Sequence, residues 1–224
     1  MPARTNKLAC LELPIITPRL ILQLPAAEDV LDLKRIFRNP LTARAEGAPL
    51  HSKSEMKNPA LMVTRTVREY RSGEHLSLSV RLREDDSSIG RVGLRGLDWI
   101  WRKVESLSYW IDPKYWNRGF ATEASWFLCR GAFAQLGMRR ISSQALDPNA
   151  ASQAVLAKLG FREEGRERDA VCVRGQCMDM VLFGLLRGEL LPTSWVESPS
   201  NPRSRIQPGG PVRSVRDRPR RPAA

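Results

Sequence analysis

The most informative segment of this chain is Tyr109-Trp-Ile-Asp-Pro-Lys-Tyr-Trp-Asn-Arg-Gly-Phe-Ala-Thr-Glu-Ala124. Its alternating residues up to Ile111 predict a strand, Gly119 marks a turn, and a helix is expected to begin at about Ala121. The first amide groups of a helix have no partner within it, and the helix dipole adds positive character. The turn is therefore a ready site for a phosphate or pyrophosphate. Side chains that suit an anion stand around it: Lys114, Arg118 and Thr122.

A second segment, Asp147-Pro-Asn-Ala-Ala-Ser-Gln-Ala-Val-Leu-Ala-Lys-Leu-Gly-Phe161, predicts a helix between two caps. Asn149 can cap its start and Gly160 its end, while Ser152 lies one turn after Asn149 on the same side. Taken alone, these are ordinary capping residues. The first segment has neither the spacing of a P-loop nor that of a G-x-G-x-x-G motif.

Short strands and helices alternate along the rest of the chain, which places it in the α/β class with a mixed sheet. Strands are expected at 19–24, 76–82, 89–94, 107–111, 140–146, 161–168 and 178–186. Helices are expected at 26–37, 59–71, 121–136 and 149–159.

Length and composition indicate one folded domain with a tail. The 224 residues are 42% hydrophobic and 27% charged, as in soluble globular proteins. The apolar runs are far shorter than the ~20 residues of a membrane span, and residues 1–20 lack the apolar segment of a secretion signal. The four cysteines are too few and too scattered for a disulfide framework, so we expect a cytoplasmic protein with reduced thiols.

The net charge of +12 is unevenly distributed. Residues 192–224 carry seven arginines against Glu197 and Asp217, a net charge of +5, and seven of the sixteen prolines. This composition predicts a disordered basic tail at 192–224, after an N-terminal extension at 1–14 and a folded domain at 15–191. The basic body suits an anionic ligand or partner, although replacement of lysine by arginine through genome composition accounts for the charge equally well.

In this order, the two segments resemble the GNAT superfamily of acetyl-CoA-dependent N-acetyltransferases. The resemblance is closest to the RimJ/RimL-type branch, which acetylates the N-terminal amine of ribosomal proteins. That branch shares a T-P-R-L-x-L strand (17–22 here), a Y-W-I-x-P…W-G-x-G-[YF]-A-T-E-A element (109–124) and an N-x-x-S-x-x-V-L-x-K-L-G-F element (149–161). The pair Glu164-Gly165 and Asp179 before the last strand also match, so the resemblance covers about residues 15–190.

The resemblance implies the GNAT fold, a mixed and mostly antiparallel sheet with helices on both faces. A splayed pair of parallel strands, here ending near Ile111 and Leu146, would hold acyl-CoA. It also implies acetyl-CoA as cosubstrate, no metal, and direct attack of an uncharged amine on the thioester in a ternary complex. The residues it assigns to CoA binding are Tyr109, Trp110, Ile111, Asn117, Arg118, Gly119, Phe120, Ala121, Thr122, Asn149 and Ser152.

Three positions depart from the pattern of many GNAT enzymes. Trp116 stands where Gln or Arg is common, and Asn117 replaces a glycine, although Asn tolerates positive φ. Leu156 occupies the position of a Tyr that protonates the leaving thiolate in many members. Ser152 is then the candidate acid.

The candidate base is a carboxylate. Many family members have this carboxylate on the strand before Tyr109. Here Ser106 occupies the usual position and the carboxylate is offset, as Glu105. Glu167 and Asp169 are alternatives. An α-amine with a pKa near 8 needs only deprotonation relayed by water. The candidate catalytic residues are Ser152, Glu105 and Asp169.

Three functions remain open at this point. The chain acetylates a protein N-terminus, or it acetylates a small amine such as an antibiotic, polyamine or amino acid, or it is a non-catalytic module that binds CoA or RNA. The expected partners are acetyl-CoA, an amine acceptor, and a ribosome or RNA that contacts the basic tail. No membrane is expected, and the chain is a monomer or a homodimer. Cys172 and Cys177 are expected to be surface thiols rather than zinc ligands.

Overall fold

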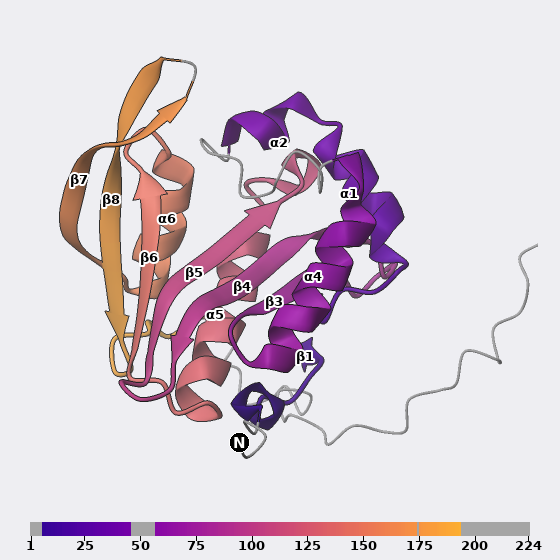
Figure 1. Ribbon diagram of the computed structural model, residues 1–224, viewed down its shortest axis with the longest axis horizontal. Helices are drawn as coiled ribbons and strands as arrows, with labels where there is room; N and C mark the ends of the chain where they lie inside the picture. The colour runs from indigo at the N-terminus through magenta and orange to yellow at the C-terminus, as the bar shows by residue number, and fades with distance from the viewer. Residues whose placement is uncertain (1–5, 46–56, 174, 194–224) are drawn as a thin grey trace, which may run out of the picture. The chain divides into compact units, whose positions relative to one another are not determined.

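A twisted sheet forms the centre of the protein in the computed structural model, which describes residues 6–45, 57–173 and 175–193 (Figure 1). The sheet has eight strands, namely β1 (Ile15–Ile16), β2 (Leu20–Gln23), β3 (Leu76–Leu82), β4 (Ser88–Asp98), β5 (Lys103–Ile111), β6 (Arg140–Leu146), β7 (Arg162–Val173) and β8 (Gln176–Leu186). The helices are α1 (Asp29–Phe37), α2 (Pro40–Ala45), α4 (Pro59–Ser72), α5 (Phe120–Ala134) and α6 (Ala150–Leu159), with short 3-10 turns η1 (Lys7–Cys10) and η2 (Pro113–Tyr115).

The strand order is β1-β2-β3-β4-β5-β6-β8-β7. Neighbouring strands run antiparallel except β5 and β6, which are parallel. This arrangement confirms the expected mixed and mostly antiparallel sheet.

The parallel strands β5 and β6 separate soon after they begin. They pair only at Lys103 with Arg140 and at Val104 with Ile141. Beyond those pairs β5 continues to Ile111 and β6 continues to Leu146, so one edge of β5 has no strand partner there. We call this region, 105–111 of β5 and 142–146 of β6, the splay (Figure 1). At its narrow end the Ser143 hydroxyl donates a 2.9 Å hydrogen bond to the carbonyl of Leu107.

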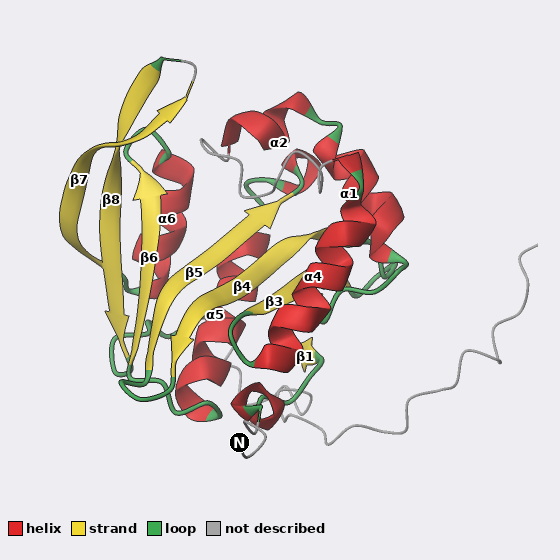
Figure 2. Ribbon diagram, in the orientation of Figure 1, coloured by secondary structure: helices red, strands yellow, loops and turns green. Residues whose placement is uncertain are grey.

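Helices cover both faces of the sheet, with α1 and α4 on one face and α5 and α6 on the other (Figure 2). The alternation of β3 explains this arrangement, because Leu76, Leu78, Val80 and Leu82 are all buried on one face. On the opposite face of β3, polar side chains bond the strand to α1. The buried carboxylate of Asp29 in α1 accepts from Ser79 at 2.9 Å and from Arg81 at 2.5 Å.

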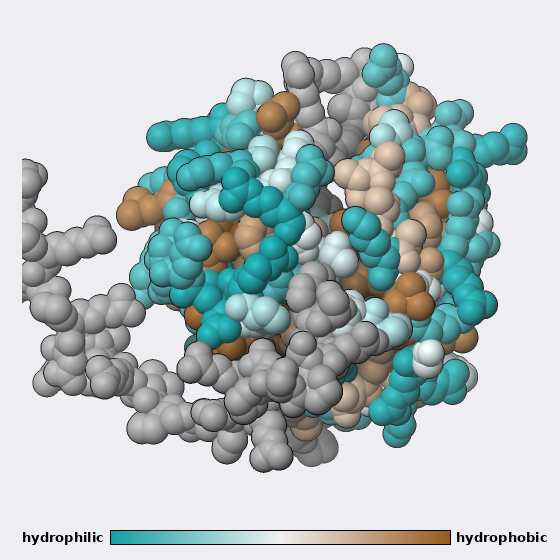
Figure 3. All heavy atoms as spheres, turned by 180° about the vertical axis from the view of Figure 1, so that it is seen from behind, coloured by the Kyte–Doolittle hydropathy of each residue, from teal (hydrophilic) through white to brown (hydrophobic). Residues whose placement is uncertain are grey.

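The outer surface over α5 and α6 is mainly polar. Figure 3 shows this side, opposite to that of Figure 1, with hydrophilic residues over most of the described surface and hydrophobic residues in smaller patches. Within the described ranges, no helix is long and apolar enough to span a membrane. The same ranges contain no cluster of three or more His, Cys, Asp or Glu arranged to hold a metal ion.

The structure corrects one expectation about the cysteines. Cys172 and Cys177 form a disulfide instead of remaining reduced thiols. They are directly paired residues of the β7–β8 hairpin, which brings their Cα atoms to 3.9 Å and puts both side chains on one face. Cys10 is a free exposed thiol and Cys129 is a free buried one.

The compactly folded part of the chain ends at Leu191, and two hydrogen bonds hold that residue in place. The Leu191 amide donates to the Leu159 carbonyl at 3.1 Å, and the Trp126 indole donates to the Leu191 carbonyl at 2.8 Å. The predicted tail at 192–224 lies outside the described residues apart from its first two, so the domain limits stay a prediction.

Candidate functional site

The turn between β5 and α5 depends on two residues with left-handed backbone conformation. Gly119 has a φ of +78° and Asn117 a φ of +59°. Glycine adopts such angles freely, and Asn is among the side chains that tolerate them, so replacement of a glycine by Asn117 preserves the turn. The Trp116 indole donates a 2.7 Å hydrogen bond to the Ile111 carbonyl and thereby ties the turn to the end of β5.

The first turn of α5 presents amide groups to the outside. Gly119 is its N-cap and provides no side-chain acceptor. In the described part of the chain, no protein group accepts a hydrogen bond from the amides of residues 117–122. These amides and the dipole of a 15-residue helix make this turn a candidate anion site, and the exposed side chains of Lys114 and Arg118 add positive charge beside it. The sequence-predicted residues Asn117 to Thr122 therefore lie together at one turn.

A buried carboxylate holds this turn against the start of β2. Glu123 is fully buried and accepts hydrogen bonds from the Thr17 hydroxyl at 2.6 Å, the Arg19 amide at 2.9 Å and the Arg19 Nε at 2.6 Å. We call these three residues the Glu123 clamp. Arg19 also donates to the Arg118 carbonyl at 2.9 Å, and its guanidinium lies 4.4 Å from the centre of the Phe120 ring.

Sequence reasoning missed the role of the clamp. The signal was present, because the Thr-Pro-Arg and Ala-Thr-Glu elements occur in the same chain, but no local pattern indicates that they meet. Their contact shows that residues 17–19 hold the start of α5 in place.

The far end of the splay contains a hydroxyl pair. The Tyr109 hydroxyl of β5 lies 3.0 Å from the Oγ of Ser152 in α6 and 3.0 Å from its carbonyl oxygen. Asn149, the N-cap of α6, accepts from the Ser152 amide at 3.0 Å. Burial raises the pKa of the Tyr109 phenol, so this group stays protonated at neutral pH and can donate to Ser152. The structure thus brings three sequence-predicted residues together across the splay.

The remaining predicted residues of β5 occupy different environments. Ile111 is buried. Trp110 lies on the face opposite to Ser152, and the centre of its ring is 5.7 Å from that of the Phe37 ring of α1. Leu156 is fully buried in α6 and serves as a core residue.

Two of the candidate bases, Asp169 and Glu167, have no described contact with the hydroxyl pair. The side chain of Glu105 lies outside the described part of the structure. Asp169 and Glu167 are exposed on β7, the edge strand, which β8 separates from β6. The Asp169 amide donates to Asp179 at 3.1 Å, and no described contact joins Asp169 to Tyr109 or Ser152.

A cysteine nucleophile has no support in this region. Cys129 in α5 is completely buried, and burial raises the pKa of its thiol, so the reactive thiolate is disfavoured.

Comparison with known proteins identifies the family. The family model of the acetyltransferase (GNAT) domain matches residues 19–162. The chain therefore belongs to the GNAT acetyltransferase family and is an acyltransferase.

Two relatives come from Bacillus subtilis. The chain is 37% identical over 105 residues to YdaF, which is named for ribosomal N-acetyltransferase activity; the match covers 47% of this chain and 57% of YdaF. The chain thus spans little more than half the length of that relative. It is 27% identical over 175 residues to the N-acetyltransferase YoaA, covering 78% of this chain and 97% of YoaA.

A solved structure shares the fold. RimJ of Mycobacterium smegmatis, in complex with CoA-disulfide, superposes with a TM-score of 0.70 at 22% identity, covering 81% of this chain and 91% of RimJ.

Proposed function

We propose that this protein transfers the acetyl group of acetyl-CoA to the N-terminal α-amine of a protein. The observation that carries the proposal is the separation of β5 and β6 after Val104 and Ile141, with the amide-rich turn at the end of β5. Two comparisons support it, because RimJ was solved in complex with CoA-disulfide and YdaF is named as a ribosomal N-acetyltransferase.

The splay, the turn after β5 and the start of α6 would each hold a different part of acetyl-CoA. The amides of residues 117–122 would hold the pyrophosphate, with Lys114 and Arg118 close by. The unpaired edge of β5 would hydrogen-bond the amides of the pantetheine arm as a neighbouring strand does. The thioester would then lie toward Tyr109 and Ser152, where the hydroxyl pair closes the far end.

The chemistry is a direct transfer. The uncharged amine attacks the thioester carbonyl, a C–N bond forms, the C–S bond breaks, and the amine loses a proton while the sulfur gains one. The Ser152 hydroxyl would donate to the departing thiolate, positioned by Asn149 and Tyr109. An α-amine with a pKa near 8 reaches its neutral form through water, so Glu105 and Asp169 remain candidate bases without being required.

The proposal includes a contact between the basic tail and ribosomal RNA. Seven arginines among residues 192–224 suit the phosphates of ribosomal RNA. Binding through them would weaken steeply with added salt, and a chain without the tail would lose that dependence.

A thiol-release assay with two acceptor panels tests the proposal. One panel contains peptides with a free N-terminus, each matched to an N-acetylated copy that keeps an internal lysine. The other contains polyamines, aminoglycosides and amino acid amides. The proposal expects CoA release with the free peptides and none with their blocked copies. If a small amine were turned over faster than every peptide, the acceptor would be a small amine instead of a protein N-terminus. No turnover with either panel would indicate a non-catalytic module.

A further inference from the structure

A hollow on the α4 face of the sheet has a floor of small residues. The register places Ser77 of β3 opposite Gly93 of β4, and Gly93 opposite Ser108 of β5. These three residues form one row across three strands on the same face. A Cβ added at Gly93 would lie 2.7 Å from the Leu76 carbonyl oxygen, so only glycine fits at its centre.

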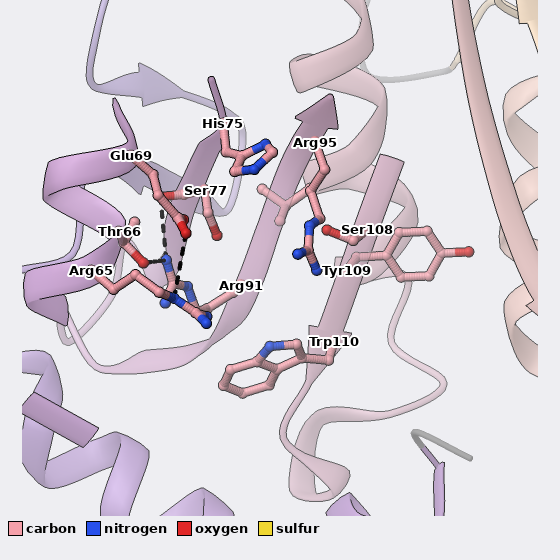
Figure 4. Close-up of a pocket in the computed structure, with 11 residues that line it drawn as sticks. Arg65, Thr66, Glu69, His75, Ser77, Arg91, Arg95, Ser108, Tyr109 and Trp110 are labelled. Atoms are coloured by element: carbon pink, nitrogen blue, oxygen red, sulfur yellow. Dashed lines mark hydrogen bonds and ion pairs between the residues drawn. The ribbon is translucent and has the colours of Figure 1, made fainter. Parts of the chain in front are cut away.

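Arginines line the walls of this hollow. Arg91 and Arg95 stand two residues to either side of Gly93 on the same face of β4, and Arg65 reaches over from α4 (Figure 4). We call the site formed by Arg65, Arg91, Arg95 and this row the cationic hollow. Its further lining residues are Thr66, Glu69, His75, Val92, Tyr109 and Trp110.

The two arginines of β4 differ in their freedom. Arg91 is 4% exposed and donates to the Thr66 hydroxyl at 2.8 Å and to the Ser77 carbonyl at 3.4 Å, which fixes its guanidinium in the hollow. Arg95 is exposed, and among the described residues it forms no ion pair. Glu69 is the one carboxylate among the lining residues and lies 3.6 Å from Arg65. The lining thus has three guanidinium groups against one carboxylate, which favours an anion.

The cationic hollow adjoins the strand on which acetyl transfer is proposed to occur. Ser108 and Trp110 of β5 face it, whereas the Tyr109 ring between them points away and its hydroxyl contacts Ser152 on the other side (Figure 4). The same three residues of β5 therefore separate the hydroxyl pair from the cationic hollow. A group bound in the hollow would therefore lie across β5 from the hydroxyl pair, and residues 117–122 do not line the hollow.

We propose that the cationic hollow binds a carboxylate of the acceptor, and that the acceptor is a protein with an acidic residue next to its N-terminus. This inference rests on the proposed function and specifies its substrate. Arg95 supplies the accessible charge, Arg91 fixes the orientation of the anion, and the Trp110 ring packs against the aliphatic part of the acceptor side chain.

The test compares kcat/KM for peptides that differ only in the residue after the N-terminal one, which is Asp, Asn or Lys. The full-length protein is expected to prefer Asp over Asn by about tenfold, the effect of one hydrogen-bonded charge pair. Arg95→Gln should reduce the preference to within about twofold, and Arg95→Glu should reverse it in favour of Lys. Arg68→Gln is the matched control, because Arg68 lies exposed on α4 and does not line the hollow.

Two further measurements separate the alternatives. CoA affinity by calorimetry should be the same in Arg95→Gln and the unmodified protein; a large loss would place a CoA phosphate in the hollow and overturn the inference. Free aspartate tested against aspartate diamide shows whether a small molecule provides the carboxylate, and a preference for free aspartate over every peptide would also overturn it.

Equal rates with Asp and Asn peptides would refute the carboxylate site while leaving acetylation of N-termini intact. Absence of turnover with all peptides, together with turnover of a small amine, would instead refute the proposed function.

Discussion

The Glu123 clamp gives a quantitative prediction for Glu123→Gln. Glutamine keeps the shape of the side chain, and its carbonyl oxygen can still accept from Thr17 and from the Arg19 amide. Its amide nitrogen replaces the oxygen that lies 2.6 Å from Arg19 Nε, so one charge-assisted hydrogen bond is lost. Such bonds contribute about 1.5–3 kcal/mol. Because the Arg19 side chain is 41% exposed, we lower the expected loss to about 1–2 kcal/mol.

For a domain of this size that loss corresponds to a decrease in melting temperature of about 2–8 °C. CoA affinity should decrease several-fold as well, because Arg19 no longer holds the Arg118 carbonyl firmly. Calorimetric melting and CoA titration measure the two effects, with Glu84→Gln in the exposed β3–β4 turn as control. A Glu123→Gln protein with unchanged melting temperature and unchanged CoA affinity would refute the assignment of the clamp.

Three further changes test other parts of the account. Gly119→Glu puts a negative side chain on a φ of +78° beside the proposed pyrophosphate site and should abolish CoA binding; unchanged affinity in a folded variant would remove that site. Ser152→Ala should lower kcat by roughly ten- to a hundredfold at unchanged CoA affinity, and Tyr109→Phe by about two- to tenfold; a loss of stability with unchanged kcat would make both residues structural. A chain ending at Thr193 should melt like the full chain, whereas one lacking Leu191 should melt lower; equal melting of all three would contradict the described contacts of Leu191.

Local patterns predicted much of the fold. The strict alternation of 76–82 predicted the bounds of β3, and the strand expected at 140–146 has the bounds of β6. Caps were equally informative: Asn149 accepts from the Ser152 amide at the start of α6, and Gly160 has the left-handed conformation at its end. Such elements are predictable because their determinants lie within a few residues of each other.

Elements that depend on distant partners were missed or shortened. The two-residue strand β1 has almost no pattern of its own and exists because it pairs with β2. Strand β5 was expected only from Leu107, although pairing with β4 begins at Lys103. The helix α2, which begins with Pro40, was not expected, although proline suits the first position of a helix.

In the functional regions, too, residues close together in the sequence were predictable, and contacts between distant residues were not. The turn at 117–122 was predicted because its glycine, its following helix and its basic neighbours are contiguous. The Glu123 clamp joins residues 104 positions apart, and the Tyr109–Ser152 contact joins residues 43 positions apart. The cationic hollow requires the register of three strands, which places Gly93 opposite Ser77 and Ser108. None of these contacts follows from a local pattern.

A crystal structure of the protein with bound CoA tests the central claim most directly. The account predicts the pyrophosphate within hydrogen-bond distance of the amides of residues 117–122, the pantetheine arm along the unpaired edge of β5, and the sulfur beside Ser152. CoA bound outside the space between β5 and β6, or a sulfur remote from Ser152, would contradict it.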